Sequence, residues 1–360
     1  MNSSASAAQV VFLDIGQGDS TLVRLPNGQH MLVDVYRCPG EGTVDLFKVL
    51  RDCLPPGENG RQLLDYLVIT HAHDDHIWGL GDLAEEFDIG QLWVPQYGTK
   101  KKLSENYDAF VKVVEDQPED RKVWQKGSRT PVAELGDDGE VSVRCFSPPG
   151  YVEVEDTLDE EEARRVVHEN CGVYRLTFSG VSVMLTGDSN LPAWERIVGY
   201  YDGATDGEGL GVLSSRVLHA SHHGSRTFVV NNKGEEPWLE ALHAIDPQDI
   251  VVSVGADNKH DHPHQEMIDI YDSAAGSDHV RQTCLDGTLV MTITGEDTYE
   301  LQPDPSYAER FGWDEDGGSE ASGGPTPGGG GSRERRPPVL PPPGFEKTPQ
   351  RAPRRERYGR

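Results

Sequence analysis

The segment of residues 71–76, with the sequence HAHDDH, constrains this chain more than any other feature. His71 and His73, one residue apart, can reach the same ion, while Asp75 and His76 can turn toward a second ion a few ångströms away. A histidine-rich exposed loop is the alternative explanation. The apolar run 66–70 directly before the segment predicts a buried strand and favours a metal site. The segment therefore predicts a two-metal hydrolytic site at the end of a strand.

The length and composition indicate one globular domain without a membrane segment. Apolar runs recur evenly through the 360-residue chain up to about Leu301, which favours a single domain over residues 1–304. No apolar run reaches the roughly 18 residues that a spanning helix needs, and residues 1–9 carry no basic or apolar leader. We therefore expect a cytoplasmic protein with no membrane partner. The five cysteines form no CxxC pair, so we expect reduced thiols.

The net charge of -28 is unevenly distributed. Residues 333–360 hold nine Lys or Arg against three Glu, so the rest of the chain is even more acidic than the total. An acidic surface repels polyanions at long range and argues against loose, sequence-independent coating of nucleic acid. It is compatible with a nucleic acid substrate, because a pair of divalent metal ions supplies concentrated local positive charge. General solubility is the alternative explanation of the acidity.

Strands and helices alternate along the chain, and His and Asp side chains that can bind metal ions follow the predicted strands. An antiparallel meander is predicted over 10–35, helices over 43–54 and 104–116, and a strand pair over 172–185. The acidic stretch 152–162 predicts an exposed loop. Such a pattern is typical of an α/β layered domain with its site at one rim of the sheets.

The character of the chain changes after Pro303. Residues 317–332 are nearly all Gly, Ser, Ala and Pro, and a proline run over 337–343 lies in a basic background. Neither segment can bury enough apolar surface to offset the entropy of ordering, so we expect a disordered tail over 305–360. The proline run can adopt polyproline II and dock on a protein partner; a plain linker is the alternative.

Four more Asp and His residues that can bind metal ions lie next to predicted strands. Asp34 ends an early strand, His168 precedes the strand pair, Asp188 ends it after a glycine, and His222 follows the next strand. With these residues the chain resembles the metallo-β-lactamase superfamily over roughly residues 8–300. The resemblance implies a four-layer αββα sandwich, two sheets face to face with helices outside, and a metal site for one or two ions at one edge.

The resemblance also implies a ligand set. His71, His73 and His168 would hold one ion, Asp75, His76 and His222 the other, and Asp188 would bridge both, with a hydroxide as nucleophile between them. Two alternatives stay open: His168 as an ordinary loop histidine, and His223 in place of His222.

The predicted catalytic residues lie around this ligand set. Asp75 is expected to orient the water, and His262 and Ser225 to contact the substrate or protonate the leaving group. His260 and His264 are interpreted as surface residues. Histidine and carboxylate ligands favour Zn²⁺, with Mn²⁺ as the alternative.

A narrower resemblance concerns the substrate. The segments 12–20, 185–188, 221–225 and 254–263 are similar to the soluble hydrolase domain of the ComEC competence proteins. That similarity implies a phosphodiesterase or nuclease acting on DNA or RNA. Two other functions stay open: a hydrolase of a small ester, lactone or phosphorylated small molecule, and a non-catalytic scaffold acting through the proline-rich tail.

Overall fold

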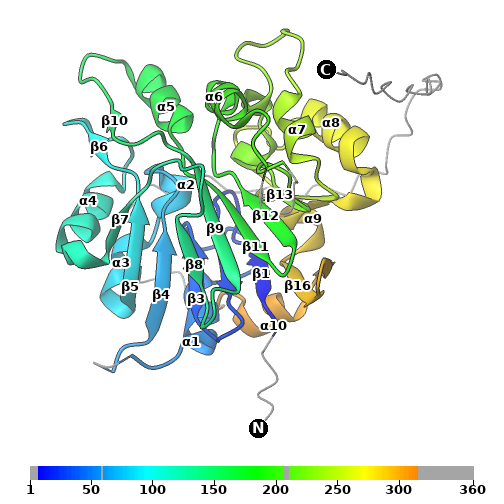
Figure 1. The fold of residues 1–360 in the computed structure, drawn as a ribbon. Helices are drawn as coiled ribbons and strands as arrows, with labels where there is room; N and C mark the ends of the chain where they lie inside the picture. The colour runs from blue at the N-terminus through cyan, green and yellow to red at the C-terminus, as the bar shows by residue number, and fades with distance from the viewer. Residues whose placement is uncertain (1–6, 58–59, 206–210, 315–360) are drawn as a thin grey trace, which may run out of the picture. The chain divides into compact units, whose positions relative to one another are not determined.

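Two facing β-sheets with helices on their outer sides build the protein (Figure 1). The computed structural model describes residues 7–57, 60–205 and 211–314. These described residues all belong to one compact unit. The predicted tail from residue 315 onward, with its proline run, lies outside the described residues.

The first sheet joins the amino-terminal strands to the last two strands of the described chain, in the order β17-β16-β1-β2-β3-β4-β5-β7. Its strands are β1 (Gln9–Phe12), β2 (Thr21–Arg24), β3 (His30–Val33), β4 (Leu63–Val68), β5 (Asp88–Val94), β7 (Lys122–Trp124), β16 (Leu289–Gly295) and β17 (Thr298–Pro303). The strands from β17 to β3 pair antiparallel, and those from β3 to β7 pair parallel.

The second sheet has the order β15-β14-β13-β12-β11-β9-β8. Its strands are β8 (Ala133–Leu135), β9 (Val141–Ser147), β11 (Val173–Phe178), β12 (Val181–Leu185), β13 (Val217–His219), β14 (Asp249–Val252) and β15 (Val280–Gln282). The strands from β12 to β15 are parallel, and the others are antiparallel. A separate parallel pair joins β6 (Tyr97–Gly98) to β10 (Val152–Glu153).

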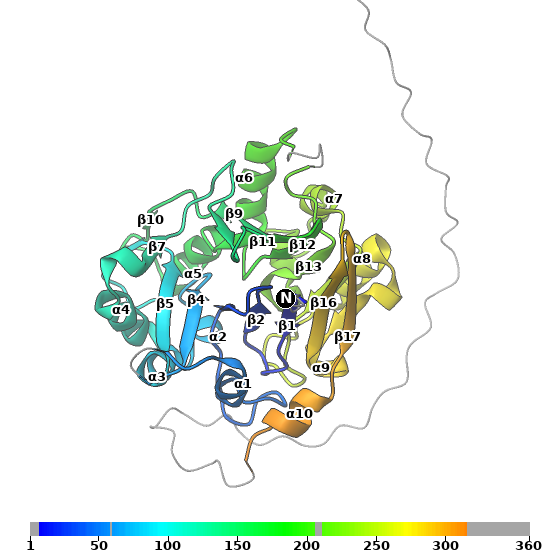
Figure 2. The same cartoon turned by 60° about the horizontal axis from the view of Figure 1, so that its bottom comes forward.

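Helices cover the outer face of each sheet. Those of the described chain are α1 (Leu46–Cys53), α2 (Asp74–Ile77), α3 (Leu80–Glu86), α4 (Tyr107–Asp116), α5 (Glu160–Glu169), α6 (Leu191–Tyr201), α7 (Glu240–Ile245), α8 (Gln265–Ala275), α9 (Thr283–Asp286) and α10 (Ser306–Phe311). Short 3-10 turns are η1 (Glu119–Arg121), η2 (Ser221–Gly224), η3 (Arg226–Phe228) and η4 (Ser277–His279). In Figure 2, α1 and α10 lie together beside the first sheet.

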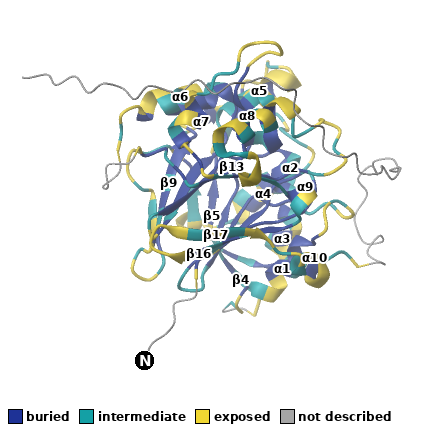
Figure 3. Cartoon of the chain, turned by 90° about the vertical axis from the view of Figure 1, so that its right-hand side faces the viewer, coloured by how far each residue is buried: buried dark blue, intermediate teal, exposed yellow. Residues whose placement is uncertain are grey.

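Three apolar clusters separate the layers. Neighbouring residues of one strand face different clusters: Val10 and Phe12 of β1 pack between the sheets, whereas Val11 packs under α1 and α3. In the second sheet, Val183 faces the first sheet and Met184 faces α6 and α8. β3, β12 and β13 are buried along their whole length, and their residues are apolar except for His30, Ser182 and His219. Figure 3 shows buried strands between the more exposed helices. The predicted four-layer αββα sandwich is confirmed.

Two segments differ from the sequence prediction. The acidic stretch 152–162 is not one exposed loop, because it contains β10 and the start of α5. Asp159 caps α5 in a capping box with Glu162, which gives these acidic residues a favourable place at the helix start. In addition, α10 packs on α1 with Phe311 buried, within the segment that was assigned to the tail from residue 305. Where the domain ends stays a prediction.

The helices of the described residues are too short or too polar to cross a membrane.

Candidate metal centre

The HAHDDH segment leaves β4 and turns into α2 at the rim where the parallel strands of both sheets end. His73 is the N-cap residue of α2, so the segment changes direction between its second and third histidine. The carboxylate of Asp74 points elsewhere: it accepts hydrogen bonds from the backbone N–H groups of Glu105 (3.0 Å) and Asn106 (2.8 Å) before α4. Asp74 therefore fixes the segment to α4, and its neighbours remain available to the centre.

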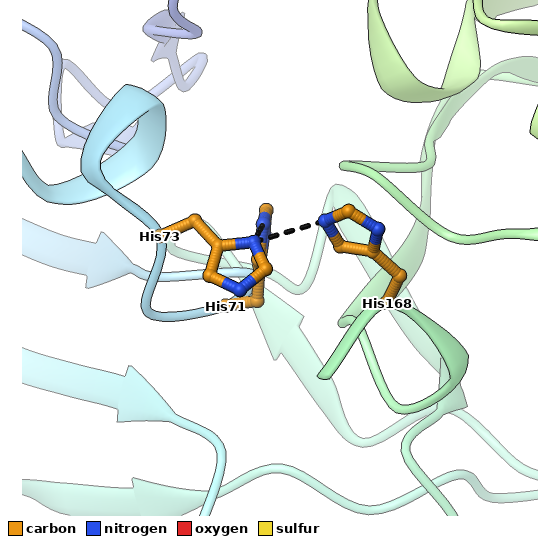
Figure 4. A group of neighbouring side chains, drawn as sticks. All are labelled: His71, His73 and His168. Carbon is orange, nitrogen blue, oxygen red and sulfur yellow. Dashed lines mark hydrogen bonds between the residues drawn. The ribbon is translucent and has the colours of Figure 1, made fainter. Parts of the chain in front are cut away.

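Three imidazoles form the first group of the centre. The Nε2 atom of His71 lies 3.1 Å from Nδ1 of His73, which lies 2.9 Å from Nε2 of His168 (Figure 4). Burial lowers the pKa of all three residues, that of His73 to about 4. Neutral imidazoles keep the lone pairs that a metal ion needs. His168 comes from the last turn of α5, so it is brought to the centre by a helix rather than by a loop.

Asp188, directly after β12, stands between this group and a second one. Its Oδ2 atom lies 3.6 Å from Nε2 of His168 and 3.5 Å from Nε2 of His222. Its Oδ1 atom lies 3.1 Å from Nε2 of His76 and 3.7 Å from Nε2 of His223. Burial alone would raise the pKa of Asp188, but the surrounding histidines, His222 foremost, hold it well below its usual range. The two carboxylate oxygens thus face two separate sets of imidazoles.

Asp34 orients His76 toward Asp188. Nδ1 of His76 lies 2.8 Å from Oδ2 of Asp34, and Asp34 also accepts hydrogen bonds from the backbone N–H (2.6 Å) and the hydroxyl (2.7 Å) of Thr70. Although burial would lower the pKa of His76, the carboxylates of Asp188 and Asp34 raise it well above its usual value. Asp34 itself adopts a φ of 62°, a left-handed conformation that costs energy and is typical of functional sites. The early aspartate therefore supports a ligand.

Both neighbours after β13, His222 and His223, reach the centre. His222, His223 and Gly224 have φ values of 50°, 52° and 76°, and this left-handed turn directs two successive side chains inward. His222 lies with His168 and Asp188, whereas His223 lies with His76 and Asp188. The expected partnership of His222 with Asp75 and His76 is thus formed by His223, whose Nε2 atom lies 3.5 Å from Oδ2 of Asp75.

Ser225 and His262 differ in their relation to the centre. The Ser225 hydroxyl accepts hydrogen bonds from the hydroxyl (3.1 Å) and backbone N–H (3.4 Å) of Thr227 and caps η3, and its contact with a substrate stays a prediction. The His262 ring lies 5.3 Å from that of His222. Burial and His222 lower the pKa of His262 to about 3, so the ring is neutral near pH 7 and suits hydrogen bonding better than proton delivery.

His260 and His264 were interpreted as surface residues. His260 is exposed. His264 is half-buried, and its Nδ1 atom accepts a hydrogen bond from the backbone N–H of Arg226 at 3.2 Å.

Sequence reasoning missed three side chains beside the centre. Asp19 lies within ligand distance of His76, Asp188 and His223. His219, at the end of β13, lies 3.6 Å from the Asp19 carboxylate. The Cys171 thiol lies 3.6 Å from Nδ1 of His71 and accepts a hydrogen bond from the Asp188 backbone N–H at 3.3 Å. Two signals were available: His219 stands at a strand end, and Asp19 lies in the segment 12–20 that resembles the ComEC proteins.

The donor set fits divalent metal ions. Nε2 of His73, Nε2 of His223 and Oδ1 of Asp19 are buried without a hydrogen-bond partner in the described part of the chain. Buried polar atoms of this kind are costly unless a metal ion or another partner compensates them. His71, His73 and His168 would hold one ion, and Asp75, His76 and His223 the other, with Asp188 between them and His222 beside the first group.

Known proteins resemble this chain in sequence and fold. The family model described as the metallo-beta-lactamase superfamily matches residues 13–236. The chain is 26% identical over 275 residues to ComE operon protein 3 of Bacillus subtilis (strain 168), covering 74% of this chain and 31% of that protein. It is 28% identical over 262 residues to competence protein ComA of Neisseria gonorrhoeae, covering 72% and 29%. The chain thus aligns with about a third of the length of these relatives.

Among solved structures, CmlA, a diiron β-hydroxylase from Streptomyces venezuelae, has a TM-score of 0.47 and 12% identity to this chain. That similarity covers 81% of this chain and 55% of CmlA.

Proposed function

The chain belongs to the metallo-β-lactamase superfamily of metal-dependent hydrolases, and on that premise we propose that it is a phosphodiesterase that cleaves DNA or RNA with two divalent metal ions. The observation that carries the proposal is the position of Asp188, whose Oδ1 and Oδ2 atoms face different groups of imidazoles. A carboxylate shared between two ligand sets is what a two-metal hydrolase requires.

The ions we expect are Zn²⁺, with Mn²⁺ as the alternative, because the donors are imidazoles and carboxylates. When bound, they would supply the Lewis acidity that activates water and polarises a phosphoryl oxygen. The protein supplies the positions: Asp34 holds the His76 ring through Nδ1, and Ser253 holds the His223 ring through its backbone carbonyl at 2.9 Å. Such fixed outer contacts keep ligands oriented and raise their basicity.

Two further residues act on the reactants in this proposal. Asp75 orients the attacking water through its carboxylate, which is about one-third exposed and therefore accessible from the solvent side. His262, beside His222, hydrogen-bonds to an oxygen of the substrate through its neutral ring. The reaction needs neither a serine nor a cysteine nucleophile, in agreement with the engagement of Ser225 in capping η3.

The nucleic acid substrate is supported by similarity. The segments 12–20 and 221–225 resemble those of ComEC competence proteins, and the relatives described above are a ComE operon protein and a competence protein. The acidic body would disfavour loose binding along a polyanion, so we expect recognition near the centre rather than along a broad basic surface. A protein partner for the proline run and the cytoplasmic location stay predictions.

The test is hydrolysis by the full chain loaded with Zn²⁺ or Mn²⁺. The substrates are single- and double-stranded DNA, RNA, bis(p-nitrophenyl) phosphate and p-nitrophenyl acetate. We expect phosphodiester cleavage by the wild type and its loss in Asp75→Ala/His76→Ala. Asp74→Asn is the matched control, since this neighbouring carboxylate contacts the start of α4 instead of the centre.

Each other outcome selects a different function. Hydrolysis of the acyl ester without any phosphodiester cleavage would replace the proposal by an esterase or lactonase. A folded wild type that binds no metal and hydrolyses nothing would contradict the enzyme and favour a scaffold acting through the tail.

A further inference from the structure

One oxygen of the buried Asp19 carboxylate has no hydrogen-bond donor among the residues that the structure describes. The residue is 3% exposed, and its Oδ1 atom has no hydrogen-bond donor within the described ranges. The nearest ring nitrogens are Nε2 of His219 at 3.6 Å and Nδ1 of His223 at 3.8 Å, both beyond hydrogen-bond distance. A buried carboxylate oxygen without a hydrogen-bond donor is unfavourable unless a cation lies beside it, which makes Oδ1 of Asp19 a candidate metal ligand.

The two neighbouring imidazoles already have other partners. Nε2 of His219 lies 2.8 Å from the hydroxyl of Ser253, and Nδ1 of His223 lies 2.9 Å from the carbonyl oxygen of the same residue. Ser253 therefore engages both rings on the side that approaches Asp19. The nitrogens of these rings that lie nearest Asp19 are thus directed to Ser253, and Oδ1 of Asp19 is left without a hydrogen-bond donor from the described chain on the side of the metal centre.

The backbone around Asp19 is built against the centre. The Asp19 N–H donates to the carbonyl oxygen of Asp75 at 2.9 Å, so the residue is fixed directly to the HAHDDH segment. Gly18 permits this approach, because a Cβ there would lie 2.1 Å from the Tyr36 ring and 2.4 Å from the Asp75 carbonyl oxygen. On the other side, Oε1 of Gln17 accepts a hydrogen bond from the Gly255 N–H at 3.1 Å. Asp19 is thus held in place by three segments.

With Asp19 included, the two halves of the centre differ in chemistry. One half offers the imidazoles of His71, His73 and His168. The other offers His76 and His223 together with carboxylates, and Asp19 lies within ligand distance of His76, His223 and Asp188. Imidazole donors suit Zn²⁺, whereas carboxylate oxygens suit harder cations such as Mn²⁺.

We propose that Asp19 is an additional carboxylate ligand of the second half and makes it the half that takes a hard, oxygen-preferring divalent cation such as Mn²⁺. The inference rests on the two-metal centre of the proposed function but not on its substrate. Phosphodiester hydrolysis can fail while the assignment of Asp19 stands.

The experiment measures Mn²⁺ binding instead of activity. The metal-free full chain receives one equivalent of Zn²⁺ and is then titrated with Mn²⁺, followed by electron paramagnetic resonance of free and bound Mn²⁺. We expect Asp19→Asn to weaken Mn²⁺ binding by about tenfold or more, the scale of losing a contact that supports a metal. Zn²⁺ uptake should be unchanged.

Asp14→Asn is the matched control. Asp14 is a buried carboxylate of the same loop, and it accepts a hydrogen bond from the Thr43 hydroxyl at 2.7 Å. We expect this variant to bind Mn²⁺ like the wild type. Thermal unfolding separates a ligand from a structural residue: Mn²⁺ should raise the unfolding temperature of the wild type more than that of Asp19→Asn, because only the wild type has the full ligand set.

Two results would overturn the proposal. The first is equal Mn²⁺ affinity in the wild type and Asp19→Asn. The second needs no variant: a wild type that has received one equivalent of Zn²⁺ and takes up no Mn²⁺, even when Mn²⁺ is in excess, has no half suited to the harder cation.

Discussion

The two halves of the metal centre are held by different kinds of support. The three-imidazole half depends on α5, which carries His168 at its last turn and starts in an acidic capping box. The carboxylate-containing half depends on side-chain and backbone contacts within the sheet rim, where Asp34 holds His76 and Ser253 holds His223. One half is therefore sensitive to helix stability and the other to buried hydrogen bonds. Asp188 is the residue that both halves share.

The largest effect is expected where the halves meet. Asp188→Asn removes a negative charge that faces both groups of imidazoles, so both ions should be bound less tightly. We expect hydrolysis to fall by more than about 100-fold, because this residue should matter more than a contact outside the ligand set. Metal content per folded chain, measured by plasma mass spectrometry, should fall toward zero. A variant that keeps both ions would show that the halves are independent.

A second variant should separate the halves. His168→Ala removes one of three imidazoles and should reduce the metal content from two ions per chain toward one, with the Mn²⁺-binding half retained. His279→Ala, an exposed histidine paired with Asp249, is the control and should bind metal like the wild type. If His168→Ala alone loses both ions, the two halves bind metal as one cooperative site, which contradicts their separation.

The support of the carboxylate-containing half can be tested through Asp34. Asp34→Asn keeps an oxygen for Thr70 but loses the charge that stabilises the His76 imidazolium in the metal-free protein and orients the ring. We expect a decrease of about 10- to 100-fold in affinity for the second ion. Calorimetric titration of each ion measures the effect. An equal decrease for both ions would contradict a role confined to one half.

The smallest effect concerns the helical support of the other half. Asp159→Ala removes the N-cap of α5 and should lower the free energy of unfolding by about 1 kcal/mol. Zn²⁺ affinity of the three-imidazole half should fall modestly, and Mn²⁺ binding should not change. Glu161→Ala, which loses a first-turn charge without a capping bond, should have a smaller effect in the same thermal and metal titrations.

The sequence predicted the fold and much of the centre because both leave local patterns. The apolar runs at the positions of β1 and β12 indicated strands, the resemblance to the metallo-β-lactamase superfamily supplied the four layers, and the spacing in HAHDDH indicated the ligands that enter through one turn. Asp188 was predicted from its place after a strand. The HAHDDH segment and Asp188 could be predicted as ligands because their positions at strand ends depend only on the local sequence.

The remaining residues depend on geometry that a sequence pattern does not encode. His222 and His223 both point inward because two successive residues adopt left-handed conformations, so no alternation rule separates them. Asp19 approaches the centre because Gly18 allows close contact with the Asp75 backbone, a tertiary condition. The start of the helix that carries His168 was predicted as part of an exposed loop over 152–162, although Asp159 and Glu162 have the spacing of a capping box.

The central claim is one centre of two ions, divided into two halves and joined by Asp188, that hydrolyses phosphodiesters. The most direct measurement adds Zn²⁺ or Mn²⁺ stepwise to the metal-free full chain and records native mass spectra and bis(p-nitrophenyl) phosphate hydrolysis in parallel. The account predicts that hydrolysis rises with the population of the two-ion species and follows the second ion. Full hydrolysis in the one-ion species, or two bound ions without any phosphodiester hydrolysis, would contradict it.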